Sequence, residues 1–321
     1  MIVVITGGTG GAKFVQGMQA CVPAENLVCI VNTGDDLEWW GLHVSPDLDS
    51  ITYALAGLLS QERGWGVEGD TFECLEVMKR LGAPSWFQLG DRDLALHITR
   101  TEMLGEGKTL TEATAAIASS FGIRSRILPM SDAHVETRIA TDHRELSFQE
   151  YFVRERYQVP AHAVRFDGAA TAKAAPGVVD AILSADAVLF APSNPITSIG
   201  PILAVPAIKQ ALLATAAPVG AVSPIVGGAP VSGPAGDLMA IRGLEVSPLG
   251  IVQAYRDFLD VLVMDERDAA LAPDVQKLGV RALCTNTIMK SAADKAALAS
   301  ATLQATLAAS HKQEPVGAER R

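Results

Sequence analysis

The chain has 321 residues, 49% hydrophobic and 19% charged, and its 26 Lys and Arg residues against 36 Asp and Glu residues give a net charge of −10. This composition is typical of a packed globular protein and excludes disorder over most of the length. The acidic balance disfavours nucleic acid as a partner, because binding to a phosphate backbone requires a basic surface. A small anionic ligand stays open, since glycine-rich loops and single cations can bind phosphate.

Four cysteines are scattered along the sequence, at Cys21, Cys29, Cys74 and Cys284. They form no C-x-x-C pair and have no histidine at metal-ligand spacing, so neither a zinc site nor a disulfide scaffold is predicted. No apolar run reaches the roughly 20 residues of a membrane-spanning helix, and the run in residues 1–8 is too short for a signal peptide. We therefore expect a cytoplasmic protein with no membrane partner.

Six short apolar runs, each followed by polar, Gly or Pro residues, predict buried β-strands. They are Ile2–Ile5, Leu27–Val31, Arg126–Leu128, Ala187–Phe190, Val219–Val222 and Val261–Met264. Strands that are apolar on both faces and separated by helical patterns belong to a parallel sheet covered by helices. The predicted fold class is therefore α/β, with a Rossmann-like, doubly wound and mostly parallel sheet. Ligands of such sheets bind beyond the carboxyl ends of the strands.

The rest of the chain is organised around this sheet, and we interpret residues 1–321 as a single elaborated α/β domain. Residues 50–121 show helical periodicity without a clear strand, which predicts a helical insertion over the ligand edge of the sheet. Residues 154–176 are polar, Ala-rich and irregular, and are interpreted as a connection or small subdomain. Residues 311–321 are expected to form a frayed tail.

A glycine-rich loop, Gly7-Gly8-Thr9-Gly10-Gly11-Ala12-Lys13, follows the first predicted strand. Glycines let backbone N–H groups approach a phosphate at the start of the next helix, so the loop predicts binding of a nucleotide or diphosphate. The residues predicted to bind it are Gly8, Thr9, Gly10, Gly11 and Lys13. The loop fits neither the Walker A pattern nor G-x-G-x-x-G. The alternative is a tight strand-to-helix turn that binds nothing.

Two acidic motifs come next. The segment Asn32–Asp36 closes the second predicted strand, where dinucleotide-binding proteins often place an acid for a ribose hydroxyl. Asn32 and Asp35 are therefore candidates for nucleotide contact, and a solvated turn is the alternative.

Asp47 and Asp49 then lie two residues apart in a Pro-containing loop before a helical run. This spacing suits an oxygen-ligand Mg²⁺ site near substrate phosphates, although either acid can instead hold a substrate hydroxyl or cap the helix.

The segment Trp86–Asp93 combines aromatic residues with a Gly turn and an Asp-Arg-Asp triplet. A flat ring and an anion can both dock on such a surface. Arg92 can bind a phosphate or carboxylate with two hydrogen bonds, or form an ion pair with Asp91 or Asp93. A single histidine such as His97 more often packs or lies at the surface than acts in catalysis.

Two loops rich in hydroxyl and amide groups follow later strands. The loop Pro192–Pro201 directly follows a buried strand and can grip a phosphate or a guanine edge. Its candidate binding residues are Ser193, Asn194, Thr197 and Ser198. The segment Ser223–Gly236 is its counterpart after the next strand. Each is a plain loop in the alternative interpretation, but several such loops at one edge of the sheet favour a binding site.

The order of these motifs resembles the 2-phospho-L-lactate transferase family (CofD, with its bacterial form FbiA), and the resemblance spans nearly the whole chain. The segments that carry it are Gly7–Lys13, Val31–Asp36, Ser45–Asp49, Leu89–Asp93, Pro129–Asp132, Phe148–Tyr151, Pro192–Pro201 and Ser223–Gly236.

The resemblance implies a step in the synthesis of the deazaflavin coenzyme F-420. Family members take a phosphorylated three-carbon acid, 2-phospholactate or phosphoenolpyruvate, from its guanosine diphosphate conjugate. They join it to the ribityl hydroxyl of the deazaflavin Fo, release GMP and require Mg²⁺; a homodimer is usual. By the family pattern Asp49 and Gln88 contact Fo, and we add Asp91 and Arg92 as candidates. Asp47 and Asp49 are the candidate Mg²⁺ ligands, and Asp49 can also polarise the attacking hydroxyl.

Two other functions stay open at this point. One is a nucleotide-sugar or nucleotidyl transferase that uses the same edge of the sheet but ignores Fo. The other is a non-catalytic nucleotide sensor of the YvcK type, whose glycine-rich loop looks similar. The segment Trp86–Asp93 and the acids Asp47 and Asp49 distinguish them, because a sensor has less reason to keep these residues.

Overall fold

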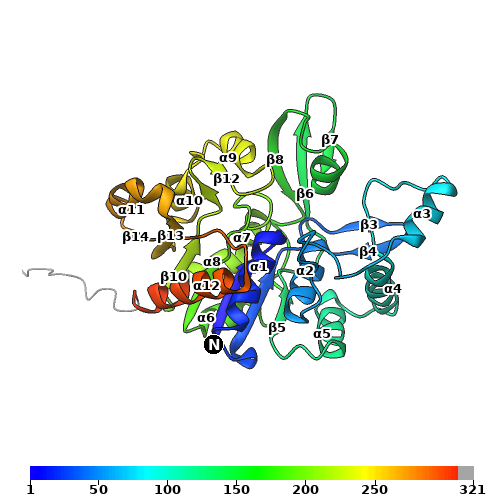
Figure 1. The fold of residues 1–321 in the computed structure, drawn as a ribbon, viewed down its shortest axis with the longest axis horizontal. Coiled ribbons are helices and arrows are strands. Elements are labelled where there is room, and N and C mark those ends of the chain that lie inside the picture. The colour runs from blue at the N-terminus through cyan, green and yellow to red at the C-terminus, as the bar shows by residue number, and fades with distance from the viewer. Residues whose placement is uncertain (310–321) are drawn as a thin grey trace, which may run out of the picture.

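The computed structural model describes residues 1–309, which are built around a seven-stranded parallel sheet (Figure 1). Its strands are β1 (Ile2–Thr6), β2 (Leu27–Val31), β5 (Arg126–Pro129), β9 (Ala187–Phe190), β10 (Val219–Val222), β13 (Val261–Asp265) and β14 (Arg281–Thr285). The predicted α/β, doubly wound fold and the six predicted strands are confirmed. The tail predicted at residues 311–321 lies outside the described residues.

Alternate side chains of the central strands point to opposite faces of the sheet and enter two separate cores. Val4 of β1 lies beside Cys29 of β2 and Leu189 of β9, and all three belong to one core. That face is covered by α1 (Gly8–Gln19), α2 (Pro46–Leu55) and α12 (Ala292–Leu307). The other face is covered by α6 (Val178–Leu183), α7 (Gly200–Ala204), α8 (Pro206–Ala214) and α10 (Pro248–Tyr255).

The order of the strands is β14-β13-β10-β9-β1-β2-β5. The chain runs outward from β1 through β2 to β5, and then returns to β9 on the other side of β1. The direction of winding therefore reverses between β1 and β9. The loops after these two strands turn to opposite faces, and such a reversal is where open α/β sheets form a ligand crevice.

Helices and a hairpin extend from the β2–β5 side of the sheet (Figure 1). The hairpin is formed by β3 (Leu37–Trp39) and β4 (Leu42–Val44), and the helices are α3 (Glu73–Arg80), α4 (Asp91–Gly105) and α5 (Leu110–Ser120). Between α2 and α3, Leu59 and Val67 form an isolated antiparallel bridge. Residues 50–121 thus hold most of α2, all of α3 to α5, and the loop that joins them.

A small antiparallel sheet, ordered β7-β6-β8, lies beside the central sheet. Its strands are β6 (Glu136–Thr141), β7 (Glu145–Ser147) and β8 (Ala161–Asp167), and a π-helical turn, η2 (Glu150–Arg154), precedes β8. The interpretation of residues 154–176 as irregular missed β8. Val164 is the buried residue of that strand, so its sequence has no apolar run.

The remaining elements are short. They are η1 (Ala24–Asn26), β11 (Ile225–Val226), β12 (Ala229–Pro230), α9 (Ala235–Ile241), η3 (Glu266–Leu271) and α11 (Ala272–Lys277). Within residues 1–309 no helix combines the length and the apolar character needed to cross a bilayer.

Candidate active site

A cavity of about 840 Å³ opens where the winding of the sheet reverses. Its floor is formed by the loops that follow β1, β9 and β10 and by the first turn of α2. Trp65, Trp86 and Gln88 of the helical insertion line one part of the wall, and Phe148 and Phe152 beside the small sheet line another. The predicted location of the site at the carboxyl edge of the sheet agrees with this cavity.

The glycine-rich loop is held tightly against two other segments. Helix α1 begins at Gly8, whose φ of +67° is in the left-handed region that favours glycine. The Gly8 N–H donates to Asp47 Oδ1 at 2.8 Å. A Cβ at Gly10 would lie 2.6 Å from the carbonyl oxygen of Pro192. The glycines therefore permit close packing of α1 on the β9 loop and on α2, in addition to access for a phosphate.

The loop after β9 is fixed to the glycine-rich loop by Ser193. Its Oγ donates to the Gly7 carbonyl at 2.7 Å and accepts from the Gly7 N–H at 3.2 Å. Asn194 stabilises the same loop, because its Oδ1 accepts from the Ile196 N–H at 2.9 Å. Thr197 also lines the cavity, and its buried hydroxyl has no hydrogen-bond partner among the described residues. A ligand in the cavity can supply one.

Asn32 joins the acidic residues of the site. Its Nδ2 lies 3.0 Å from Asp35 Oδ2, 3.0 Å from Asp47 Oδ2 and 3.3 Å from the Thr197 carbonyl oxygen. Its Oδ1 accepts from the Gly34 N–H at 2.8 Å. One fully buried amide thus sets the separation of two carboxylates and of the loops after β2 and β9.

Asp35 and Asp47 are buried carboxylates that oppose each other electrostatically. Burial raises the pKa of Asp35 well above its usual range, and the charge of Asp47 raises it further. Burial also raises the pKa of Asp47 to about 6, although hydrogen bonds from Asn32 and the Gly8 N–H lower it. Within residues 1–309 neither acid has a Lys, Arg or His within ion-pair distance.

This pair fits a divalent cation. Asp35 and Asp47 both line the cavity, and a hydrogen bond from the Thr137 hydroxyl lowers the pKa of Asp35 only in part against its burial. Mg²⁺ is commonly bound by one or two carboxylates together with substrate phosphates and water. The described residues hold no cluster of three or more His, Cys, Asp or Glu side chains suited to a metal. An ion at Asp35 and Asp47 would therefore take its other ligands from substrate and water.

Comparison with known proteins decides the family. The model of one family, described as 2-phospho-L-lactate transferase CofD, matches residues 2–293 of this chain. The chain belongs to the CofD family.

Curated relatives carry two different names. A 2-phospho-L-lactate transferase of Methanosarcina mazei is 42% identical over 304 residues, which cover 95% of this chain and all of the relative. A phosphoenolpyruvate transferase of Streptomyces griseus is also 42% identical, over 94% of this chain and 97% of the relative. This member of the CofD family is therefore a transferase, and its identity to the two relatives does not distinguish their donors.

The fold of this CofD member is shared with a solved structure of low sequence identity. A UPF0052-family protein of Bacillus halodurans superimposes with a TM-score of 0.63 and 15% identity, covering 94% of this chain and 98% of the other. At that identity the likeness concerns the fold alone.

Most residues predicted for ligand binding line the cavity of this CofD member. They are Gly8, Thr9, Gly10, Lys13, Asp35, Asp47, Gln88, Ser193, Asn194, Thr197 and Ser198. Asn32 lies directly behind them and holds the two acids. Gly11 faces β1 instead, where a Cβ would lie 2.0 Å from Thr6 Oγ1, so it serves the packing of α1 on the sheet.

Asp49 is placed differently from the prediction. Helix α2 begins at Pro46, so Asp47 and Asp49 are both helical and project about 200° apart around the helix axis. The Asp49 carboxylate forms a buried ion pair with the Arg100 guanidinium and lies 3.6 Å from His97 Nδ1. The predicted Mg²⁺ site shared by Asp47 and Asp49 does not fit this geometry, because the two carboxylates face opposite sides of one helix.

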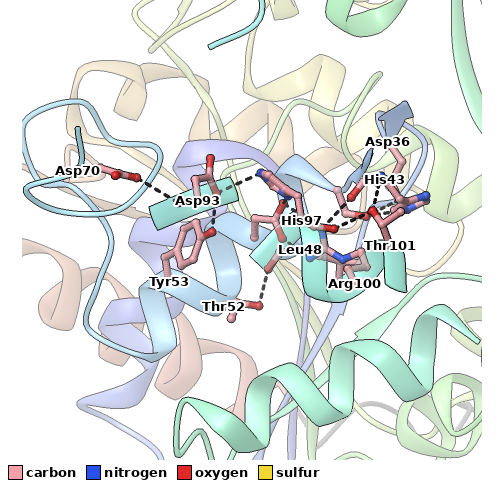
Figure 2. Close-up of polar contacts among 12 residues, drawn as sticks. Asp36, His43, Leu48, Thr52, Tyr53, Asp70, Asp93, His97, Arg100 and Thr101 are labelled. Atoms are coloured by element: carbon pink, nitrogen blue, oxygen red, sulfur yellow. Dashed lines mark hydrogen bonds and ion pairs between the residues drawn. The ribbon is translucent and has the colours of Figure 1, made fainter. Parts of the chain in front are cut away.

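The cluster around Asp49 extends along α4, and Figure 2 shows its members Asp93, His97 and Arg100. His97 Nε2 lies 3.3 Å from Asp93 Oδ1, and the Tyr53 hydroxyl donates to the same carboxylate at 2.5 Å. These groups lower the pKa of Asp93 in spite of its burial. The ion pair of Asp49 with Arg100 and the hydrogen bond from Tyr53 to Asp93 thus tie α2 to α4.

Asp91 and Arg92, predicted to contact substrate, are not among the residues that line the cavity. The Asp91 carboxylate accepts from the Thr71 hydroxyl at 2.6 Å and from the backbone N–H of Glu73 and Cys74, so it stabilises the start of α3. The Arg92 guanidinium donates to the Glu68 carbonyl oxygen at 3.1 Å. Both residues hold the insertion together.

Several cavity residues were not singled out from the sequence. Trp65 and Gln61 come from the loop between α2 and α3, and Lys290 and Lys295 come from the start of α12 and the loop before it. The Ala-rich pattern of α12 gave no signal for a ligand-facing lysine. Gln149 belongs to the Phe148–Tyr151 motif, and its Nε2 donates to the Asp35 carbonyl oxygen at 3.3 Å.

Proposed function

We propose that this chain transfers a phosphorylated three-carbon acid, 2-phospho-L-lactyl or phosphoenolpyruvyl, from its guanosine diphosphate conjugate to the ribityl hydroxyl of Fo. The observation that carries the proposal is the similarity over full length to relatives named 2-phospho-L-lactate transferase and phosphoenolpyruvate transferase. The reaction forms a phosphodiester, releases GMP and belongs to the synthesis of coenzyme F-420.

This reaction requires the protein to position the two substrates and to stabilise negative charge, and it requires no covalent intermediate with the protein. The hydroxyl oxygen of Fo attacks the phosphorus next to the three-carbon acid, the bond from that phosphorus to the bridging oxygen breaks, and the hydroxyl proton is lost. Phosphoryl transfer of this kind depends on placing both partners in line and on stabilising the charge of the leaving group. The N–H groups of the glycine-rich loop and the Ser193–Ser198 loop are our candidates for holding the diphosphate.

Mg²⁺ is the cofactor in this proposal, with Asp35 and Asp47 as its protein ligands. When bound, the ion would offset the negative charge of the diphosphate. Asn32 orients both acids, and the Gly8 N–H fixes Asp47 relative to the glycine-rich loop. Asp49 acts from the other side of α2, as a positioning residue for the helix start that carries Asp47.

The flat ring of Fo can pack against aromatic side chains of the cavity. Trp86 packs edge-on against Trp39, with ring centroids 4.7 Å apart, and also lines the cavity beside Gln88. Phe148 and Phe152 are stacked 5.4 Å apart on another part of the wall. We propose Gln88 and these aromatic rings as the surroundings of the deazaflavin.

The test is transfer by purified protein with Fo and Mg²⁺. The guanosine diphosphate conjugates of phosphoenolpyruvate, 2-phospholactate and 3-phosphoglycerate are offered separately, and product masses are read by mass spectrometry. We expect a phosphodiester product with one of the first two donors. Binding of GDP without product from any donor would overturn the proposal and favour a nucleotide sensor or another nucleotide-dependent transferase.

Two further expectations belong to this proposal. We expect a cytoplasmic enzyme, in keeping with the free thiols of its four cysteines, and a homodimer, as is usual for the family that the sequence resembles. Light scattering on the purified chain checks the second expectation, and a mass equal to one chain would contradict it.

A further inference from the structure

Lys295 is a buried cation that three separate elements enclose. It lies on α12 and is 7% exposed. Its Nζ donates to Gln16 Oε1 on α1 at 2.7 Å and to Gln61 Oε1 in the loop between α2 and α3 at 3.0 Å. Both acceptors are neutral amide oxygens, although an ammonium group carries a full charge and three N–H donors.

A second lysine faces the same part of the cavity. Thr9, Lys13 and Gln16 are spaced by four and three residues, so they share one side of α1, and Thr9 and Lys13 line the cavity together with Lys295. Burial lowers the pKa of Lys295, and the positive charge of Lys13 lowers it further. Within residues 1–309 no carboxylate lies within ion-pair distance of either ammonium group.

Such an arrangement is unfavourable unless an anion joins it. A buried charge is costly when it is neither paired nor fully hydrogen-bonded, and a second charge of the same sign adds to the cost. An anionic oxygen between the two ammonium groups removes both penalties, because it accepts the remaining N–H donors and cancels charge. Both lysines line the space open to ligands, so that anion can arrive with a substrate.

We propose that Lys13 and Lys295 form a subsite for an anionic oxygen group, phosphate or carboxylate, of the nucleotide-activated donor. The inference rests on the proposed function and adds Lys295, which lies beyond the residues matched by the family model, to the binding machinery. Along α1, Lys13 follows Gly10 by three residues and Gln16 follows Lys13 by three, so the subsite extends from the glycine-rich loop along the side of the helix.

The subsite would also place the donor in contact with three elements of the fold at once. Gln61 belongs to the loop before α3, and Gln16 and Lys295 belong to the α1–α12 face. The donor anion would complete the contact among these elements.

The experiment compares Lys295→Met, which keeps the length of the side chain and removes its charge, with Lys277→Met, a control at an exposed lysine of α11. Affinities for the guanosine diphosphate conjugate of phosphoenolpyruvate, for GDP and for Fo are measured by calorimetry, and melting temperatures are measured without ligand. Lys13→Met is the second variant, for use if Lys295→Met fails to fold.

We expect Lys295→Met to bind the conjugate about 10- to 100-fold more weakly, the effect of losing one charged hydrogen bond. Affinity for Fo and the behaviour of Lys277→Met should not change, and the melting temperature without ligand should stay equal or rise. If the affinity for GDP falls by the same factor, the anion that the lysines bind belongs to the diphosphate. If only the affinity for the conjugate falls, the anion is the carboxylate of the three-carbon acid.

Two outcomes overturn the subsite. One is unchanged affinity of Lys295→Met or Lys13→Met for the conjugate. The other is a lower melting temperature with equal weakening of the conjugate and Fo, which is what a purely structural lysine predicts. Because binding is measured without turnover, failure of the proposed function appears separately, as donor binding that leads to no product.

Discussion

Asp47 and Asp49 leave the same turn of α2 and meet opposite surroundings. Asp47 faces the cavity beside Asp35, where two buried acids lack a cationic partner in the described residues and the pKa of each is raised. Asp49 faces α4, where its carboxylate pairs with the Arg100 guanidinium and lies beside His97. In the first arrangement two acids repel each other until a cation arrives, and in the second the carboxylate already has a cationic partner. The presence or absence of a cationic partner, more than the residue type, therefore distinguishes a structural acid from a ligand-binding one.

The largest effect is expected on the side of α2 where Asp49 pairs with Arg100. Arg100→Met leaves the buried Asp49 carboxylate without its partner, and breaking a buried ion pair in this way costs about 3–5 kcal/mol of folding stability. Urea denaturation measures the loss. Arg80→Met, at an exposed residue of α3, is the control, and an equal loss in both variants would contradict the role assigned to Arg100.

The second effect separates the two acids directly. Asp47→Asn keeps the shape of the side chain but removes a proposed Mg²⁺ ligand, so transfer should fall about 100-fold or more, with little change in melting temperature. Asp49→Asn should instead lower the melting temperature. Steady-state kinetics over a Mg²⁺ titration, with thermal melts of both variants, provide the measurement. If Asp47→Asn retained full transfer, the acid pair would not be the metal site.

A third test uses pH on the acidic side. The folded-state pKa of Asp47 is raised from 3.8 to about 6, so the folded state binds this proton more tightly than the unfolded state. Stability without Mg²⁺ should therefore rise as pH falls through 6. Between pH 7 and pH 5 the gain from this group is on the order of 1 kcal/mol. Urea midpoints at the two pH values should differ less in Asp47→Asn than in the unmodified chain.

A fourth effect, a loss of folding stability, is expected at the edge of the cluster around Asp49. Tyr53→Phe removes the hydroxyl that donates to Asp93, while His97 remains beside that carboxylate. The loss should be about 1.5–3 kcal/mol, as for a hydrogen bond to a charged group. Urea denaturation of Tyr53→Phe against Arg100→Met tests the ranking, and the reverse order would show that the cluster depends on Asp93 more than on Asp49.

The central fold was predictable from the sequence because its strands are buried on both faces. The exceptions follow the same rule. Strand β14 (Arg281–Thr285) lies at the edge of the sheet with its residues partly exposed, and β8 (Ala161–Asp167) belongs to a small solvated sheet. Neither has the apolar run that predicts a strand from sequence.

The sequence predicted which loops line the candidate site, but it did not predict where each side chain points. The glycine-rich loop and the Ser193–Ser198 loop line the cavity as expected. Asp47 and Asp49 were expected in a loop before the helix, but both belong to α2, where a spacing of two residues directs them about 200° apart. Lys295 reaches the cavity through the packing of α12 on α1, which no local pattern encodes.

The close packing of the glycine-rich loop limits how this enzyme can be redesigned. A Cβ at Gly7 would lie 2.5 Å from Asp47 Oδ2 and 2.9 Å from Ser198 Cβ, and one at Gly10 would meet Pro192. The glycine-rich loop, the start of α2 and the loop after β9 therefore pack tightly against one another. A larger residue at Gly7 or Gly10 would have to displace the acidic helix or the loop after β9, so a changed loop requires matching changes in its neighbours.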